Sequence, residues 1–179
     1  MCHPAPTHNG RTHRIPIHKG NLMTDTKKPI QDYYNPKAAI CYGCGISNEH
    51  GLHIKTYWDG TVGHSRFLPH PEHTAFPGYV YGGLLASLID CHSIGTAIAA
   101  MYDAEGRAPD TQPEITCVTA NLNVTFKQKT PMGTELKLEA RIKELTPKKA
   151  IVVTEVSANG EICVVGEVVA VRVSSRLFE

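Results

Sequence analysis

The fold is decided by one continuous stretch, His73-Thr-Ala-Phe-Pro-Gly-Tyr-Val-Tyr-Gly-Gly-Leu-Leu-Ala-Ser-Leu-Ile-Asp90, in which a turn leads into an apolar helix. Pro77-Gly78 is a turn signal, and the pair Gly82-Gly83 stands where the apolar run begins. We predict a helix from Tyr81 or Gly82 to Met101. Because its side chains are apolar around most of the circumference, this helix is expected to be central in the molecule.

Gly83 and Asp90 are spaced so that they share one helix face. Asp90 follows Gly83 by seven residues, which is about two helical turns. A helix N-terminus offers free N–H groups to an acceptor such as a carbonyl oxygen, and a carboxylate can activate water. Together these groups meet the needs of water attack on a carbonyl or thioester. The alternative is that the glycines only permit tight packing and that Asp90 is solvated, which is difficult on a central apolar helix.

Strands are predicted on both sides of the helix. Residues 52–57 and 62–67, separated by Asp59-Gly60, read as a hairpin. The segments 136–143, 150–157 and 161–173 follow the helix, and Asn159-Gly160 joins the last two as a second hairpin. One long apolar helix against an antiparallel meander is an α+β architecture.

The strand predicted at 115–127 alternates cleanly between apolar and polar residues. One face would carry Val118, Ala120, Leu122, Val124 and Phe126, and the other Cys117, Thr119, Asn121, Asn123 and Thr125. If the apolar face covers the chain's own helix, Thr119 and Asn121 face away from it. A partner subunit would then give them a role; the alternative is that Thr119 is a good β-former on an exposed face.

Three ordered blocks resemble the hotdog-fold acyl-CoA thioesterases, in the phenylacetate-pathway (PaaI-like) branch of the hydroxybenzoyl-CoA thioesterase superfamily. The first block is Pro77-Gly78, Gly82-Gly83 and Asp90, with Tyr81 where that family most often has histidine. The others are Val118–Phe126 with Pro131-Met-Gly133, and Cys41-Tyr-Gly-Cys-Gly45 with Gly51-Leu52. The resemblance covers residues 41–173 and implies a hotdog fold, an antiparallel sheet wrapped around one long central helix.

The resemblance also implies an activity, hydrolysis of an acyl-CoA thioester to free acid and coenzyme A. Asp90 would be the general base, or less favourably the nucleophile, and the N–H of Gly82 or Gly83 would polarise the carbonyl. In that family the site lies between two subunits, so we expect a homodimer or dimer of dimers in which Thr119 of the other chain orients the water.

Substrate binding is assigned to residues around this site and at one further turn. The phenol of Tyr81 can donate a hydrogen bond, and His73 and Asn121 complete the expected substrate-binding set. Lys148 and Lys149 stand where that family often has a turn that meets the nucleotide end of coenzyme A, although Pro147 replaces its usual glycine.

Cysteine and histidine near the N-terminus raise the question of a metal. Cys41-x2-Cys44 and His50-x2-His53 offer four zinc ligands in thirteen residues, but structural zinc sites usually close a longer loop between the two pairs. We therefore favour a knot of turns with buried thiols, and expect neither a metal nor a cofactor. Cys91 and His92 point about 100° away from Asp90 on the helix, and are interpreted as packing residues or as residues that tune Asp90 from its flank.

Two rival functions remain open. A hotdog dehydratase or hydratase would also use acyl thioesters, and His70-Pro-x-x-His73 resembles the histidine loop of acyl-carrier-protein dehydratases. A non-catalytic acyl-CoA-binding module is the other, and turnover of a thioester panel separates it from an enzyme.

Composition fits one ordinary domain. The chain has 179 residues, 41% of them hydrophobic, which is enough for one core. Its net charge is +1, so it lacks the excess of basic residues typical of nucleic-acid-binding proteins. We see no run near the roughly 18 apolar residues of a membrane span, and six cysteines without a secretory signal favour the cytoplasm. We expect residues 1–28, rich in proline and with four evenly spaced histidines, to be a disordered or artefactual leader ahead of a single domain at 29–179.

Overall fold

The apolar run after the glycine pair forms one long helix, α1 (Gly82–Ala104), in a computed structural model that describes residues 28–37 and 39–174. The helix continues three residues beyond the predicted end at Met101 and stops ahead of Gly106, which adopts a positive φ of 63°. The predicted leader lies almost entirely outside the described residues, at 1–27.

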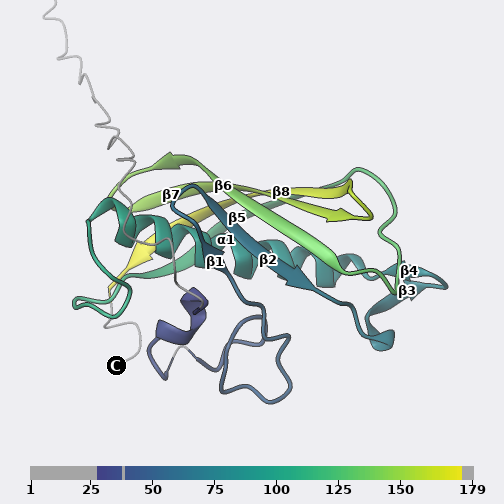
Figure 1. The fold of residues 1–179 in the computed structure, drawn as a ribbon, viewed down its shortest axis with the longest axis horizontal. Helices are drawn as coiled ribbons and strands as arrows, with labels where there is room; N and C mark the ends of the chain where they lie inside the picture. The colour runs from purple at the N-terminus through teal and green to yellow at the C-terminus, as the bar shows by residue number, and fades with distance from the viewer. Residues whose placement is uncertain (1–27, 38, 175–179) are drawn as a thin grey trace, which may run out of the picture.

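A six-stranded antiparallel sheet packs against one side of α1 (Figure 1). Its order is β1-β2-β6-β7-β8-β5, with bounds β1 (Tyr57–Trp58), β2 (Val62–Phe67), β5 (Thr116–Phe126), β6 (Leu136–Leu145), β7 (Lys149–Ala158) and β8 (Glu161–Val173). A small hairpin of β3 (Thr74–Phe76) and β4 (Tyr79–Val80) turns at Pro77-Gly78, just before the helix. One central helix on a large antiparallel sheet confirms the predicted α+β hotdog architecture.

The first predicted strand is mostly not a strand. Only Tyr57 and Trp58 pair with β2, whereas residues 52–56 hydrogen-bond to the N-terminal segment. The N–H groups of Leu52 and Ile54 donate to Tyr42 O and Gly43 O, and Thr56 O accepts from Ile30. These backbone groups are satisfied outside the sheet, so alternation alone misplaced the strand.

A bulge in β5 changes the face that its residues present. Thr119 pairs with Ala170 of β8, but Asn121 pairs with the next residue, Val169, so Ala120 is an extra residue between them. Before the bulge, the odd-numbered residues Cys117 and Thr119 therefore face α1. After the bulge, the even-numbered residues from Leu122 onward face α1 instead. The expectation that Thr119 faces away from its own helix was wrong, because a bulge shifts the alternation by one residue.

The sheet and α1 enclose the core. The buried aliphatic residues from both include Leu85, Leu88, Ile89, Ala97, Leu136, Leu138, Val152, Val156, Val164 and Val168. By length and composition α1 is also apolar enough to cross a membrane, although polar residues such as Asp90 and His92 interrupt its apolar run. In this fold 78% of its most apolar window is buried inside the protein, as expected for a core helix.

The N-terminal segment covers part of the helix that the sheet leaves open, below α1 in Figure 1. The short 3₁₀ helix η1 (Ile30–Tyr33) packs there, and Gln31 Nε2 donates to Thr56 Oγ1 at 3.0 Å. Thr56 Oγ1 in turn pairs with His92 Nδ1 of α1 at 2.9 Å. Burial lowers the pKa of His92 to about 4, so this imidazole is neutral in the network.

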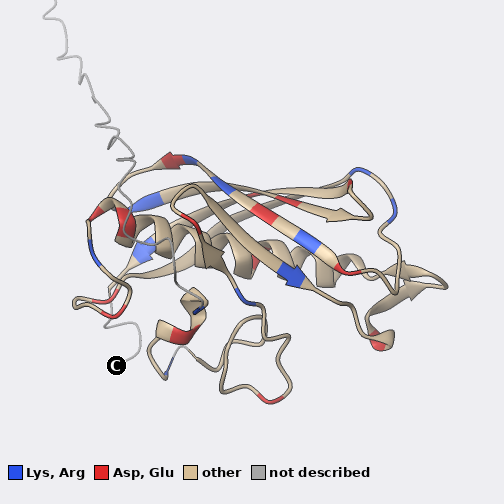
Figure 2. Ribbon diagram, in the orientation of Figure 1, with Lys and Arg blue, Asp and Glu red and all other residues tan. Residues whose placement is uncertain are grey.

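Charged residues lie along β6 and in the loops around the sheet (Figure 2). On β6, Lys137, Glu139 and Arg141 point outward and alternate with the buried Leu138 and Ala140. Exposed ion pairs such as Arg141–Glu139 at 2.7 Å contribute little to stability, so this face acts mainly as the solvated side of the sheet.

Candidate active site

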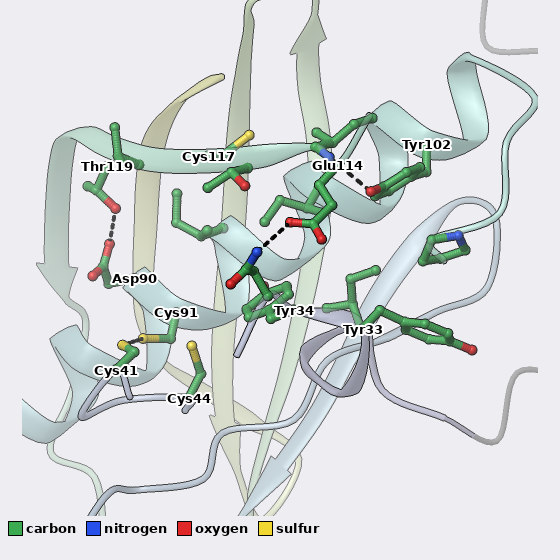
Figure 3. Close-up of a pocket in the computed structure, with 18 residues that line it drawn as sticks. Tyr33, Tyr34, Cys41, Cys44, Asp90, Cys91, Tyr102, Glu114, Cys117 and Thr119 are labelled. Atoms are coloured by element: carbon green, nitrogen blue, oxygen red, sulfur yellow. Dashed lines mark hydrogen bonds between the residues drawn. The ribbon is translucent and has the colours of Figure 1, made fainter. Parts of the chain in front are cut away.

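The centre of the site is a hydrogen bond between the helix acid and the edge strand. Thr119 Oγ1 donates to Asp90 Oδ1 at 2.5 Å, and both residues belong to the same chain (Figure 3). The bulge in β5 makes this contact possible, because it lets Thr119 share the inner face with α1. One carboxylate oxygen of Asp90 is thereby held by a hydroxyl donor.

Asp90 is only partly shielded from solvent. Burial raises the pKa of Asp90, and the hydrogen bond from Thr119 acts in the opposite direction by stabilising the carboxylate. A nearby Cys41 thiolate would raise this pKa further. A carboxyl with an upward-shifted pKa, in contact with a pocket, has the character of a general base.

Asp90 and Thr119 lie at one end of an apolar pocket of about 270 Å³. Its walls come from the second half of α1, the first half of β5 and the N-terminal segment. They include Tyr33, Tyr34, Ile94, Ile98, Tyr102, Ile115, Cys117 and Val118 (Figure 3). At its rim Asn35 Nδ2 donates to Glu114 Oε2 at 3.3 Å. A cavity of this size, with a few polar groups at one end, suits an apolar group attached to a reacting centre.

The glycine pair starts α1 as predicted, and it lies on the side of Asp90 away from the apolar pocket. The first helical hydrogen bonds run from the N–H groups of Leu84 and Leu85 to Tyr81 O, so the N–H groups of Gly82 and Gly83 precede them. Gly83 lies about 10 Å along the axis from Asp90, a span that a water and a bound carbonyl can bridge. The glycines do not line the 270 Å³ pocket among its described residues.

Tyr81 and His73 stand beside this helix start. The ring of Tyr81 lies so close over Gly83 that a Cβ there would come within 2.4 Å of it. The Tyr81 N–H donates to His73 O at 2.8 Å, and His73 Nδ1 accepts the N–H of His70 at 3.0 Å. Both predicted substrate-binding residues are therefore placed at the N-terminus of α1.

The remaining predicted binding residues lie apart from Asp90. Asn121 follows the bulge and pairs with Val169, so its side chain points to the outer face; the expectation that it shares a face with Thr119 was wrong. Lys149 pairs with Val171 on the same outer face and forms an ion pair with Glu144 at 3.4 Å. Lys148 is exposed in the turn before β7.

The cysteines gather in a set that the sequence did not predict. The sulfurs of Cys41, Cys44 and Cys91 lie within 4.8 Å of one another, whereas His50 and His53 are outside this group and exposed. Cys91 was expected to be a packing residue or to tune Asp90 from its flank. The one sequence signal for its role is its position directly after Asp90 on a buried helix. That signal is weak, because only the tertiary fold brings the turn at residues 41–45 against this helix.

A family model described as "Thioesterase superfamily" matches residues 77–173 of the chain. A thioesterase superfamily protein of known structure from Shewanella loihica PV-4 is 42% identical, with a TM-score of 0.56 and coverage of 70% of this chain and 96% of that protein. No curated protein matches the chain significantly.

Two more distant structures share the fold. The Escherichia coli PaaI protein from the phenylacetic acid degradation operon is 13% identical, with a TM-score of 0.57 and coverage of 69% of this chain and 81% of its own. The smu.793 protein from Streptococcus mutans UA159, solved with acetyl CoA bound, is 12% identical with a TM-score of 0.53, covering 64% of this chain and 82% of its own.

Proposed function

Because the chain belongs to the thioesterase superfamily, we propose that it hydrolyses an acyl-CoA thioester, with Asp90 activating the water. The observation that carries this proposal is the Thr119–Asp90 hydrogen bond at one end of an apolar pocket. It supplies an oriented carboxylate beside a space suited to an acyl group. The acetyl CoA bound by the Streptococcus mutans protein supports the choice of a coenzyme A ester.

The proposed reaction runs through a tetrahedral intermediate. Asp90 takes a proton from water as the water oxygen attacks the thioester carbon, and the carbonyl oxygen becomes an oxyanion. The N–H of Gly82 or Gly83 donates to this oxygen. The C–S bond then breaks, and the proton on Asp90 passes to the leaving sulfur, so free acid and coenzyme A are the products. Attack by Asp90 itself, through a mixed anhydride, uses the same carboxylate.

The acyl group occupies the apolar pocket in this proposal. Ile94, Ile98 and Tyr102 of α1 line one side, and Cys117 of β5 and the preceding Ile115 line the other. None of the described residues lining this pocket is a histidine, which favours hydrolysis over the histidine-dependent dehydration of a related substrate.

We also propose that the protein is a homodimer in which β5 faces the partner. β5 is an edge strand of the sheet, and it exposes Val118, Leu122 and Phe126. An edge strand with exposed apolar side chains commonly pairs with another copy.

Release of free coenzyme A from a panel of short-chain, long-chain and aromatic acyl-CoA esters tests the proposed function. We expect turnover of at least one ester, with catalytic efficiency that depends on the acyl group. Binding of the esters without any release would identify a non-catalytic module. Hydration of an enoyl-CoA without thiol release would identify a hydratase.

A further inference from the structure

We propose that Cys41, Cys44 and Cys91 bind one Zn²⁺ ion as thiolates, with the fourth coordination position open to the pocket. Two of the ligands come from the turn at residues 41–45 and the third from α1. The site joins the N-terminal segment to the central helix, beside Asp90 but separate from it.

The spacing of the sulfurs fits zinc closely. In a tetrahedral site with Zn–S bonds of about 2.3 Å, neighbouring sulfurs lie about 3.8 Å apart. The sulfurs of Cys41 and Cys91 are 4.0 Å apart, and all three lie within 4.8 Å of one another. Small side-chain movements would therefore place all three around one ion.

A disulfide fits the same geometry less well. An S–S bond is about 2.05 Å long, so Cys41 and Cys91 would have to approach by about 2 Å from their separation of 4.0 Å. A disulfide would also use only two of the three thiols. The arrangement of three sulfurs around a common centre favours a metal over an oxidised pair.

The turn at residues 41–45 is tight enough to bring two cysteines together. The Gly45 N–H donates to Cys41 O at 2.8 Å, and a Cβ on Gly45 would come within 2.6 Å of that oxygen, so the chain closes tightly there. This tight turn brings the Cys41 and Cys44 sulfurs to within 4.8 Å of each other and of the Cys91 sulfur on α1.

The turn also lies directly on the helix. A Cβ on Gly43 would come within 2.3 Å of Cys91 Sγ, so only glycine lets the two elements meet this closely. Beside them, the hydroxyl of Tyr34 is buried without a hydrogen-bond partner among the described residues. The same pocket is lined by Tyr34 and by all three cysteines, where a thiolate would accept a hydrogen bond from this hydroxyl.

The fourth position is not filled by Asp90. Its carboxylate is engaged with Thr119 and lies outside the group of three sulfurs. Binding of Zn²⁺ to three thiols releases three protons and leaves a site of net charge −1, with water as the fourth ligand. Since this water would face the pocket, we expect small soft ligands to reach the ion.

Metal content of the full-length protein, purified under reducing conditions and then loaded with Zn²⁺ and desalted, tests the proposal. We expect about one tightly held Zn²⁺ per chain. The variants Cys41→Ser, Cys44→Ser and Cys91→Ser should each lose at least about nine-tenths of it, because one missing ligand weakens a three-thiolate site strongly. Cys163→Ser is the matched control, since Cys163 is free, buried and outside the group, and it should retain the metal.

Replacement of Zn²⁺ by Co²⁺ gives a second readout that does not depend on the variants folding. Thiolate-to-cobalt charge-transfer absorption is expected in the wild-type protein, and Zn²⁺ should protect Cys41, Cys44 and Cys91 from alkylation. Metal retained by the Cys91→Ser variant would overturn the proposal, and would point to the histidines at His3, His8, His13 and His18. Wild-type protein without thiolate-to-cobalt absorption, or with a disulfide between two of these cysteines after reducing purification, would also overturn it. Neither result bears on thioester hydrolysis.

Discussion

Asp90 combines two properties that a catalytic carboxylate needs. It lies on a helix whose neighbouring residues are buried, which raises its pKa, and it contacts a hydroxyl donor, Thr119, that fixes its orientation. Desolvation makes it a stronger base than a surface aspartate, and the hydrogen bond holds one of its two oxygens.

The role of Thr119 is tested by removing its hydroxyl while keeping its shape. Thr119→Val should lower kcat roughly 10-fold to 100-fold, because a hydrogen bond to a charged group is worth about 1.5–3 kcal/mol. Steady-state kinetics of the preferred acyl-CoA ester provide the measurement. Thr119→Ser keeps the hydroxyl and should retain most of the activity, so an equal loss in both variants would assign Thr119 a packing role instead.

At the level of single residues, the sequence identified Asp90 from its place on an apolar helix, and the structure puts it beside the pocket. The resemblance named Thr119 as the residue that meets Asp90, but it assigned Thr119 to the partner chain, whereas the structure has both residues on one chain. The 115–127 segment alternates cleanly, and nothing in that alternation marks Ala120 as the extra residue of a bulge. Tertiary pairing with β8 decides where a bulge forms, so Thr119 was assigned to the wrong face.

Among the elements, the N-terminus of α1 carries the proposed oxyanion donors. Gly83→Ala should lower kcat roughly 10-fold to 100-fold, because the added methyl obstructs approach to the N–H groups. The methyl would also meet the ring of Tyr81 at 2.4 Å. The double variant Tyr81→Ala/Gly83→Ala separates the obstruction of the N–H groups from the clash with the ring. Its kcat should stay below the kcat of Tyr81→Ala alone. Recovery to the Tyr81→Ala level would show that only the ring had been displaced.

The contact between η1 and α1 depends on a buried polar network. Thr56→Val removes the group that joins Gln31 to His92, and should lower the free energy of unfolding by about 1–3 kcal/mol. Urea denaturation measures the change, and Thr56→Ser, which keeps the hydroxyl, serves as the control. A Thr56→Val variant as stable as wild type would mean that water replaces the hydroxyl in this network.

Predicted and observed strand bounds agree best where a local sequence signal, such as a turn, fixes the strand. β2 and β8 match their predicted ranges, because the Asp59-Gly60 and Asn159-Gly160 turns fix locally where each strand begins. The segment 52–56 was misassigned because its backbone partners lie in residues 30–43, a pairing that only the folded N-terminal segment creates. The cysteine group was missed for the same reason.

For the whole molecule, the placement of Asp90 and Thr119 on one chain changes the expectation for a dimer. The shared-site prediction rested on the strand face of Thr119 and on the family resemblance, and the hydrogen bond within one chain contradicts the strand-face argument. A partner subunit can still complete the pocket along β5, but it is not needed to orient Asp90.

Subunit mixing distinguishes the two arrangements. Asp90→Asn and Thr119→Val proteins, mixed under conditions that exchange subunits, should show no more activity than the two proteins kept apart, since every chain carries one damaged residue of the pair. Recovery toward about a quarter of wild-type activity would show that the two residues act across the interface, because half of the dimers would then have one intact site.

The central claim is that Asp90 performs the chemistry of thioester hydrolysis, and its most direct test is kcat of Asp90→Asn on the preferred acyl-CoA ester. We expect a fold unchanged by circular dichroism and a kcat lower by roughly 10²–10⁴-fold, because the amide cannot accept the proton of water. Asp103→Asn, on the same helix and outside the pocket, should remain within a few-fold of wild type. A folded Asp90→Asn protein with near wild-type kcat would contradict the assignment of Asp90 as base or nucleophile.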